Sequence, residues 1–187
     1  SVIIPTYREE ENIERCLQSI RRQVFENGRV EIIVVDSNSP DNTTAIAQKY
    51  ADTVIELKDR GVSKARNVGA ERAKSELLLF LDADTVLDSG FLAEIHRILI
   101  DSNVVCTIGS MESLERYGTL DNLLNFLHYS VVNFTSELTS NLGFPLFSAV
   151  CLACRKSVFE RVGGFDEGLA IAEDLVFSLR IGRAGRC

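Results

Sequence analysis

The segment Leu77-Leu78-Leu79-Phe80-Leu81-Asp82-Ala83-Asp84 decides the fold, because it joins an unbroken apolar run to two acidic residues. An apolar run of this length, bounded by polar residues, is typical of a strand buried on both faces. Residues i and i+2 of an extended chain point to the same side, so Asp82 and Asp84 can converge on one ligand. Open α/β sheets bind ligands outside the carboxyl ends of their strands. The segment therefore predicts a ligand site, with a plain turn before the next helix as the alternative.

Apolar runs and helical patterns alternate along the rest of the chain. Strands are predicted at 2–4, 30–35, 53–57, 77–81, 103–109 and 146–153. Helices are predicted at 9–23, 41–51, 62–74, 89–101, 119–139, 156–162 and from residue 173 onward. Alternation of this kind indicates βαβ units. We therefore predict an α/β fold with a mostly parallel sheet that is flanked by helices on both faces.

Composition excludes several classes of function. The chain has 187 residues, 45% of them hydrophobic and 25% charged, which is ordinary for one soluble globular domain. Its net charge of −7 argues against a nucleic-acid-binding protein, which needs a basic face, and against adhesion to anionic lipid. The sequence shows no run of the ~18 apolar residues that a membrane span requires, and no signal peptide.

The five cysteines are Cys16, Cys106, Cys151, Cys154 and Cys187. Their odd number and scattered positions do not indicate a disulfide framework. Cys151 and Cys154 have CxxC spacing, but residues i and i+3 of a strand face opposite sides and cannot chelate one metal. We therefore predict buried free thiols in a protein of a reducing compartment.

Helical spacing of apolar residues is most extensive at 119–139. The apolar positions there are Leu120, Leu123, Leu124, Leu127, Val131, Phe134 and Leu138. Such a stripe predicts either packing on the core or contact with a membrane surface. The charged residues of the segment, Asp121 and Glu137, are acidic, which disfavours lipid and favours the core.

Polar motifs accompany the other predicted elements. In chain order they are Pro5-Thr6-Tyr7, Glu9-Glu10-Glu11-Asn12, Asp36-Ser37-Asn38, Arg60-Gly61, Ala65-Arg66-Asn67, Gly163-Gly164-Phe165-Asp166-Glu167 and Glu173-Asp174. Together with the two aspartates that end the run at 77–81, this set resembles the family-2 glycosyltransferases in order and spacing. The resemblance extends from Val2 to about Gly185. It implies a GT-A fold, with a Rossmann-like sheet, that binds a nucleotide-sugar.

The resemblance places the nucleotide site in the first part of the chain. Asp36 would read uracil, and Pro5-Thr6-Tyr7 would line the base pocket together with Glu9. Arg60 and Arg66 would contact the nucleotide-sugar, in a region where glycines allow a close approach of the backbone to pyrophosphate. From the residues alone, an Asx-turn is the alternative for Asp36 and a solvated surface charge is the alternative for Arg66.

The acidic pairs would carry the chemistry. By resemblance, Asp84 is the metal ligand and Asp82 contacts the ribose or shares the metal. Mn²⁺ or Mg²⁺ would neutralise charge on the departing nucleoside diphosphate. Asp174 matches the general base of the family and Glu173 the acidic position before it. Acidic residues at a helix start also occur for dipole reasons alone, which is the alternative for this pair.

The sequence therefore predicts a metal-dependent inverting glycosyltransferase. It would move a sugar from a nucleotide-sugar, with a UDP-sugar favoured, to an acceptor hydroxyl on a saccharide or lipid carrier, in polysaccharide or glycolipid synthesis. We expect one catalytic domain, 1–187, with a nucleotide-binding part at about 1–110 and an acceptor-side part at about 111–187, in a fragment of a longer chain.

We expect a cytoplasmic location or one at the cytoplasmic face of a membrane, with membrane contact only through parts outside this chain. Three alternatives stay open. A nucleotidyltransferase and a noncatalytic nucleotide-sugar-binding protein would share the nucleotide site, whereas a glycosidase would share only the two carboxylates.

Overall fold

One mixed sheet forms the centre of the protein. The computed structural model describes residues 1–24, 28–101, 103–112, 119–141, 145–169 and 171–187. The six strands are arranged in the order β3-β2-β1-β4-β6-β5. Their bounds are β1 (Val2–Thr6), β2 (Ile32–Asp36), β3 (Thr53–Glu56), β4 (Leu77–Leu81), β5 (Cys106–Ile108) and β6 (Cys151–Arg155). The first four strands are parallel to one another, and β6 is antiparallel to both β4 and β5.

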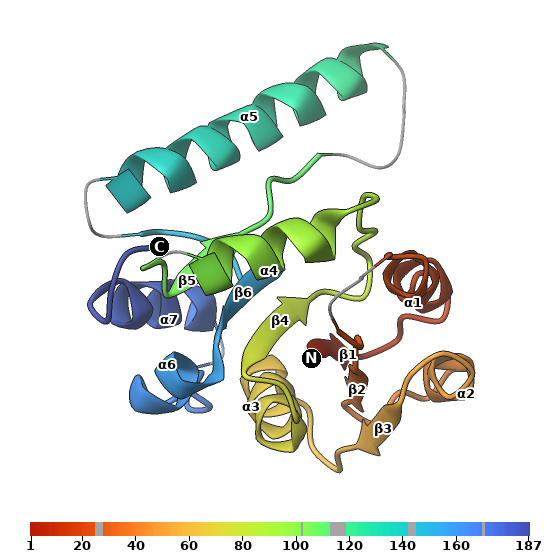
Figure 1. Ribbon diagram of the computed structural model, residues 1–187. Helices are drawn as coiled ribbons and strands as arrows, with labels where there is room; N and C mark the ends of the chain where they lie inside the picture. Colours follow the sequence, from red (N-terminus) through yellow and green to blue (C-terminus); the bar gives the residue numbers. More distant parts are fainter. Residues whose placement is uncertain (25–27, 102, 113–118, 142–144, 170) are drawn as a thin grey trace.

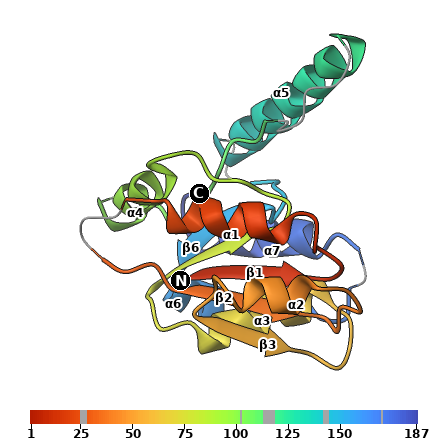
Figure 2. The ribbon, with the colours of Figure 1, turned by 90° about the vertical axis from the view of Figure 1, so that its right-hand side faces the viewer.

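Helices cover both faces of this sheet (Figures 1 and 2). Their bounds are α1 (Ile13–Arg21), α2 (Thr43–Ala47), α3 (Val62–Arg72), α4 (Phe91–Asp101), α5 (Thr119–Asn141), α6 (Lys156–Arg161) and α7 (Glu173–Gly182). The predicted α/β fold with a mostly parallel sheet is therefore confirmed.

Alternate residues of each strand enter different cores, because successive side chains of a strand point to opposite faces. Ile4 and Leu79 pack with residues of α1, α2 and α4. Ile3 and Phe80 pack with residues of α3, α6 and α7. The run at 77–81 is thus buried on both faces, as its composition predicts.

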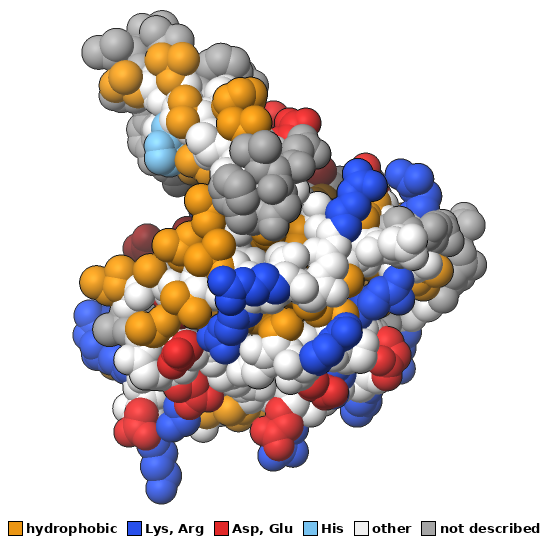
Figure 3. Space-filling model, turned by 90° about the vertical axis from the view of Figure 1, so that its left-hand side faces the viewer, with side chains coloured by type: hydrophobic (Ala, Val, Ile, Leu, Met, Phe, Trp, Pro, Cys, Tyr) orange, Lys and Arg blue, Asp and Glu red, His pale blue; other side chains and the backbone are white. Residues whose placement is uncertain are grey.

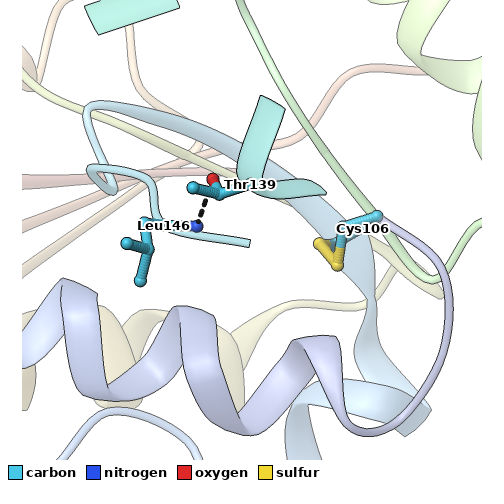
Figure 4. Close-up of a disulfide and its surroundings, with 4 residues drawn as sticks. Cys106, Thr139 and Leu146 are labelled. Atoms are coloured by element: carbon cyan, nitrogen blue, oxygen red, sulfur yellow. Dashed lines mark hydrogen bonds between the residues drawn. A yellow bond between two sulfur atoms is a disulfide. The ribbon is translucent and has the colours of Figure 1, made fainter. Parts of the chain in front are cut away.

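The sixth strand begins later than predicted. The sequence indicates a strand from residue 146, but β6 begins at Cys151. The backbone before it bonds elsewhere: the N–H of Leu146 donates to Oγ1 of Thr139, 3.1 Å away on α5 (Figure 4). The backbone at Leu146 is therefore bonded to the C-terminal end of α5 and does not extend the hydrogen-bonded ladder of the sheet.

Three cysteines are free and buried as predicted: Cys16, Cys151 and Cys154. Cys151 lies in the core beside α1 and Cys154 in the core on the other face, so their CxxC spacing does not chelate a metal. Burial is the main cause that raises the pKa of each thiol to about 12.

The prediction of free thiols is wrong for Cys106 and Cys187, which form a disulfide (Figure 4). The two residues are 81 positions apart, so their spacing gave no signal. The end of the chain lies beside β5, where the N–H of Val105 donates to the carbonyl of Arg186 over 2.7 Å, and the Cα atoms of the two cysteines are 4.7 Å apart. Because two of the five cysteines are paired, the cysteines taken together no longer support a reducing compartment. That location stays a prediction.

Helix α5 projects from the body of the protein (Figures 1 and 2). The prediction that its apolar stripe packs on the core is wrong for the stripe residues whose side chains the structure describes. These residues are exposed: Leu124, Leu127, Val131, Phe134 and Leu138. The pattern predicted the helix but not the direction in which the stripe faces. Among the described residues, no helix combines the length and the apolar character that a membrane crossing needs.

Candidate active site at the carboxyl ends of the parallel strands

The sheet topology brings the predicted nucleotide residues to one edge. Thr6 at the end of β1 stands opposite Asp36 at the end of β2, and Asp82 directly follows β4 on the other side of β1. The chain moves outward from β1 in one direction to β2 and β3, and then returns to place β4 on the opposite side. Such a switch point is where open α/β sheets bind ligands.

Asp36 joins the loops that follow β1 and β2. Its carboxylate is fully buried and accepts three hydrogen bonds. Oδ2 accepts from the Thr6 hydroxyl at 2.8 Å and from the Ser39 hydroxyl at 2.6 Å, and Oδ1 accepts from the Ser39 N–H at 2.7 Å. These bonds fix the loop that follows β2, as expected from the alternative in which Asp36 forms an Asx-turn. Recognition of a base by Asp36 stays a prediction, and would use the remaining acceptor capacity of Oδ1.

Tyr7 lies under two arginines at the same edge. The guanidinium carbon of Arg60 is 4.0 Å from the centroid of its ring, and that of Arg8 is 5.4 Å away. Arg60 also donates to the Tyr7 hydroxyl. Cation–π contacts of this kind hold side chains from two loops together. The arrangement gives a ring and two cations beside Asp36, a combination that suits a base and a phosphate.

Pro5 and Glu9 take structural positions beside this edge. Pro5 is half-buried in β1, in register with Val35. The carbonyl of Glu9 accepts the N–H groups of Asn12 and Ile13, which begins α1, and its own N–H donates to Thr43 Oγ1 at 2.8 Å. Nucleotide contacts by either residue stay predictions.

Arg66 bridges the two acidic pairs. Its guanidinium donates to Asp82 Oδ1 through Nη2 and to Glu173 Oε1 through Nη1, both at 3.0 Å. The ring of Phe165 lies 5.1 Å from the guanidinium carbon. Only 4% of Arg66 is exposed, so the alternative of a solvated surface charge is wrong. Both outer nitrogens of Arg66 are engaged by carboxylates, and its contact with a nucleotide-sugar stays a prediction.

Asp82 and Asp84 differ in environment. Burial raises the pKa of Asp82 above its ordinary value, Arg66 opposes that rise, and the nearby charge of Asp84 adds to it. Asp84 is exposed, and within the part of the chain that the structure describes its carboxylate makes no hydrogen bond or ion pair. One carboxylate oxygen of Asp82, Oδ1, is therefore bonded to Arg66, whereas the carboxylate of Asp84 is available to a ligand.

These two carboxylates fit a divalent cation only with help from a ligand. Hard cations such as Mn²⁺ and Mg²⁺ take oxygen donors, and Mg²⁺ is commonly bound by one or two carboxylates together with substrate phosphates. Asp84 and the Oδ2 atom of Asp82 could supply such donors. No group of three or more metal-binding side chains forms within the described ranges. The residues thus fit a cation that enters with a diphosphate.

A cleft of about 580 Å³ extends from this pair toward α5. Its lining includes Asp82, Asp84, Asp88, Glu112 and Tyr129. The cleft combines carboxylates with an aromatic ring, which suits the hydroxyls and apolar faces of a sugar. Residues from both sides of position 110 line it, so the division into a nucleotide-binding part and an acceptor-side part stays a prediction.

The second acidic pair begins α7. Glu173 is held by Arg66, and Asp174 accepts the N–H of Leu175 at 2.8 Å through its own Oδ1. Ala172, before them, has a left-handed backbone with φ 64°, which turns the chain sharply into the helix. The dipole alternative is compatible with this position, but the ion pair of Glu173 is an additional contact that a helix start does not require.

Asn67 was not identified as a site residue from the sequence. Its amide clasps the loop before α7: Nδ2 donates to the Phe165 carbonyl and Oδ1 accepts the Phe165 N–H, both at 2.9 Å. A side chain at Gly164 is excluded, because its Cβ would lie 2.8 Å from Asn67 Oδ1 and its φ is +63°. The adjacency of Asn67 to Arg66 was the only signal in the sequence.

Comparison with known proteins places this geometry in context. The family model described as glycosyl transferase family 2 matches residues 1–163. The chain is 29% identical to glycosyltransferase AglE of Haloferax volcanii over 99% of this chain and 62% of that protein. It is 34% identical to the uncharacterized glycosyltransferase EpsJ of Bacillus subtilis, over 96% of this chain and 54% of that protein. The chain thus spans less than two thirds of these relatives.

Two solved structures are similar to the whole described fold. TarS 1-349 of S. aureus in complex with UDP-GlcNAc has a TM-score of 0.77 and 25% identity, over 98% of this chain and 53% of that one. The mannosyltransferase PcManGT from Pyrobaculum calidifontis, in complex with GDP-Man and Mn²⁺, has a TM-score of 0.72 and 25% identity. That match covers 95% of this chain and 49% of the mannosyltransferase.

Proposed function

This chain belongs to glycosyl transferase family 2, and on that premise we propose that it transfers a sugar from a nucleotide-sugar to an acceptor hydroxyl. The observation that carries the proposal is the bridge made by Arg66. One buried guanidinium connects Asp82, beside the switch point of the sheet, to Glu173, at the start of the helix that carries Asp174. On this proposal, the bridge would hold the donor end and the acceptor end of the site in a fixed relation.

Asp174 is the proposed general base. It would take the proton of the acceptor hydroxyl as that oxygen attacks the anomeric carbon, with Glu173 fixed beside it by Arg66. The proposed reaction, as the family resemblance implies, is a single displacement without a covalent intermediate, so the anomeric configuration would invert. Asp84 and Asp82 would hold Mn²⁺ or Mg²⁺, which supplies charge neutralisation at the leaving diphosphate when bound.

A UDP-sugar is the proposed donor. Support comes from the TarS complex with UDP-GlcNAc and from Asp36, which could accept the imide N–H of uracil. GDP-Man is bound by the mannosyltransferase with a similar fold, so the base needs a direct test. The acceptor, on a saccharide or a lipid carrier, would occupy the cleft between the acidic pair of β4 and α5.

The alternatives differ in the product that they release. A nucleotidyltransferase would release pyrophosphate from a nucleoside triphosphate, and a noncatalytic sensor would bind the donor without turnover. A glycosidase would hydrolyse a glycoside and need no nucleotide. The bridge between two acidic pairs does not favour a sensor, which needs no base, or a nucleotidyltransferase, which needs no second acidic pair.

A product assay with matched donors tests the proposal. We expect release of UDP from UDP-GlcNAc or another UDP-sugar in the presence of Mn²⁺ and a saccharide acceptor, and inversion at the anomeric carbon by NMR. Asp36→Ala should weaken UDP about ten- to a hundredfold by calorimetry, because a buried hydrogen bond is lost. Tighter binding of GDP than of UDP would overturn the donor assignment, and pyrophosphate release would overturn the reaction class.

A further inference from the structure

Among its described side chains, helix α5 has polar residues that face the body and a stripe of large apolar residues that faces solvent. On the inner side, Asn133 exchanges two hydrogen bonds with the backbone of Met111, at 3.0 and 3.2 Å, and Ser136 is buried. On the outer side, five large apolar side chains are between 45% and 63% exposed. We call these residues the outer stripe: Leu124, Leu127, Val131, Phe134 and Leu138. Figure 3 shows hydrophobic side chains gathered on this projecting helix.

The spacing of the outer stripe is that of a coiled coil. Successive members are three, four, three and four residues apart, a mean of 3.5 residues. A helix with apolar residues at this interval packs against a second helix through knobs and holes, with a left-handed supercoil. The stripe spans about four turns, or roughly 21 Å at 1.5 Å per residue. It is therefore the length of two heptads.

The residues beside the outer stripe suit an identical helix. They are His128, Ser130, Thr135 and Glu137. Two of them are small hydroxyl side chains, which let helices approach, and only one is acidic. A second copy therefore meets little like-charge repulsion at this seam, although the whole chain carries −7. No basic partner is required to neutralise the surface.

A bilayer surface fits the same residues less well. Interfacial helices carry Lys and Arg that pair with anionic headgroups, and the sequence of residues 119–141 contains neither. Interfacial helices also bury a broad apolar face, whereas the outer stripe has the narrow spacing of a seam. These observations favour protein over lipid.

We propose that α5 pairs with α5 of a second copy of this chain, through the outer stripe, in a two-stranded coiled coil. The contact is isologous, since each copy contributes the same surface. Two heptads bury less than a standard interface of ~800 Å² per partner, so association belongs to the weak and concentration-dependent class. Through Tyr129 and Val132 on its inner side, the same helix lines the acceptor-side cleft, so the second copy would lie beside that cleft.

Sedimentation velocity across about 1–200 µM protein tests the proposal. We expect a monomer–dimer equilibrium in the micromolar range, consistent with a small interface. Val131→Asp combined with Phe134→Asp should weaken dimerisation by at least about a hundredfold, because it buries two carboxylates in the seam. Ile100→Asp is the matched control: Ile100 is 51% exposed on α4, and its substitution should leave the equilibrium unchanged.

Two further measurements keep the outcome decisive. Circular dichroism of the double variant verifies the fold, and the conservative Phe134→Leu should retain the dimer if the double variant fails to fold. A monomer at every concentration, or equal weakening by Ile100→Asp, would overturn the proposal. Co-sedimentation of the monomer with phosphatidylcholine–phosphatidylglycerol vesicles, lost in the double variant, would assign the stripe to lipid and overturn it also.

Discussion

The end of β4 and the start of α7 each present two carboxylates, and Arg66 divides each pair in the same way. Asp82 and Glu173 are ion-paired to its guanidinium, whereas Asp84 and Asp174 have no cation beside them in the described structure. The anchored residue precedes its unpaired partner in both regions. This difference indicates a division of roles: the anchored carboxylates set the geometry, and the unpaired ones meet ligands. Substitutions can separate these roles.

Asp174→Asn should give the largest change. The amide keeps the shape and the hydrogen bond from the Leu175 N–H but cannot accept the proton of the acceptor, so transfer should fall roughly 10²–10⁴-fold. UDP affinity should stay within a factor of two or so, since the proposed base does not contact the nucleotide. Turnover and calorimetry on one preparation separate the two effects. Glu71→Gln, exposed on α3, is the control, and near-normal transfer by Asp174→Asn would move the base elsewhere.

Arg66→Met should give the next largest change, in stability. Removing one partner leaves two carboxylates in a largely buried site without their cation, which typically costs about 3–5 kcal/mol. Urea unfolding followed by circular dichroism measures this cost. Arg72→Met, an exposed position on the same helix, should change stability by less than about 0.5 kcal/mol. Equal effects of the two substitutions would show that the bridge does not organise the site.

Asp84→Ala should affect ligand binding and leave folding intact. An exposed carboxylate contributes little to packing, but as a metal ligand it should contribute at least the roughly 10–100-fold that even outer-shell partners contribute to metal affinity. Calorimetry of UDP with Mn²⁺ should show that loss, and EDTA should give the same weak binding with the unsubstituted protein. If UDP binds equally well with Mn²⁺ and with EDTA, Asp84 is not a metal ligand.

Asp82→Asn should give the smallest change, visible in the pH dependence of stability. The folded protein raises the pKa of Asp82 above its ordinary value of 3.8, so it holds this proton at a pH where the unfolded chain has released it. The contribution of Asp82 to stability is therefore present at low pH and is lost as pH rises through its folded pKa. Relative to the unsubstituted protein, Asp82→Asn should therefore gain stability as pH rises above 3.8, the ordinary pKa of the carboxyl, toward its folded pKa.

Asp52 provides a control of opposite sign. Partial burial acts to raise its pKa, but hydrogen bonding from the Ile32 N–H and the charge of Arg21 outweigh it, so the pKa is lowered. Asp52→Asn should therefore lose stability relative to the unsubstituted protein as pH rises above its folded pKa. Parallel pH profiles for the two substitutions would contradict the assigned environments.

The sequence predicted local features well and long-range pairing poorly. The apolar run at 77–81 was enough to predict a strand buried on both faces, and the motifs were enough to predict the family. The bridge made by Arg66 could not be predicted from the sequence, because Arg66 and Glu173 are 107 residues apart and no periodicity relates them. The same limit hid the disulfide of Cys106.

An amphipathic pattern also does not define whether the apolar face of a helix points to the core or to solvent. Ile13, Leu17 and Ile20 of α1 form a stripe that is wholly buried, whereas the outer stripe of α5 is exposed. Both patterns predict a helix, but a pattern records only that one face is apolar. Which surface covers that face depends on the rest of the fold, or on another molecule.

Gly69 shows how far mutational intolerance can extend from the site. A Cβ there would lie 2.3 Å from Cγ2 of Ile3 on β1, so any side chain would push α3 away from the sheet. Arg66 and Asn67 are on the same helix, and both depend on that spacing to reach their partners. In a saturation-mutagenesis screen for activity, position 69 should tolerate glycine alone, although it donates nothing to a ligand. A map of sensitive positions would thus include residues that no map of ligand contacts contains.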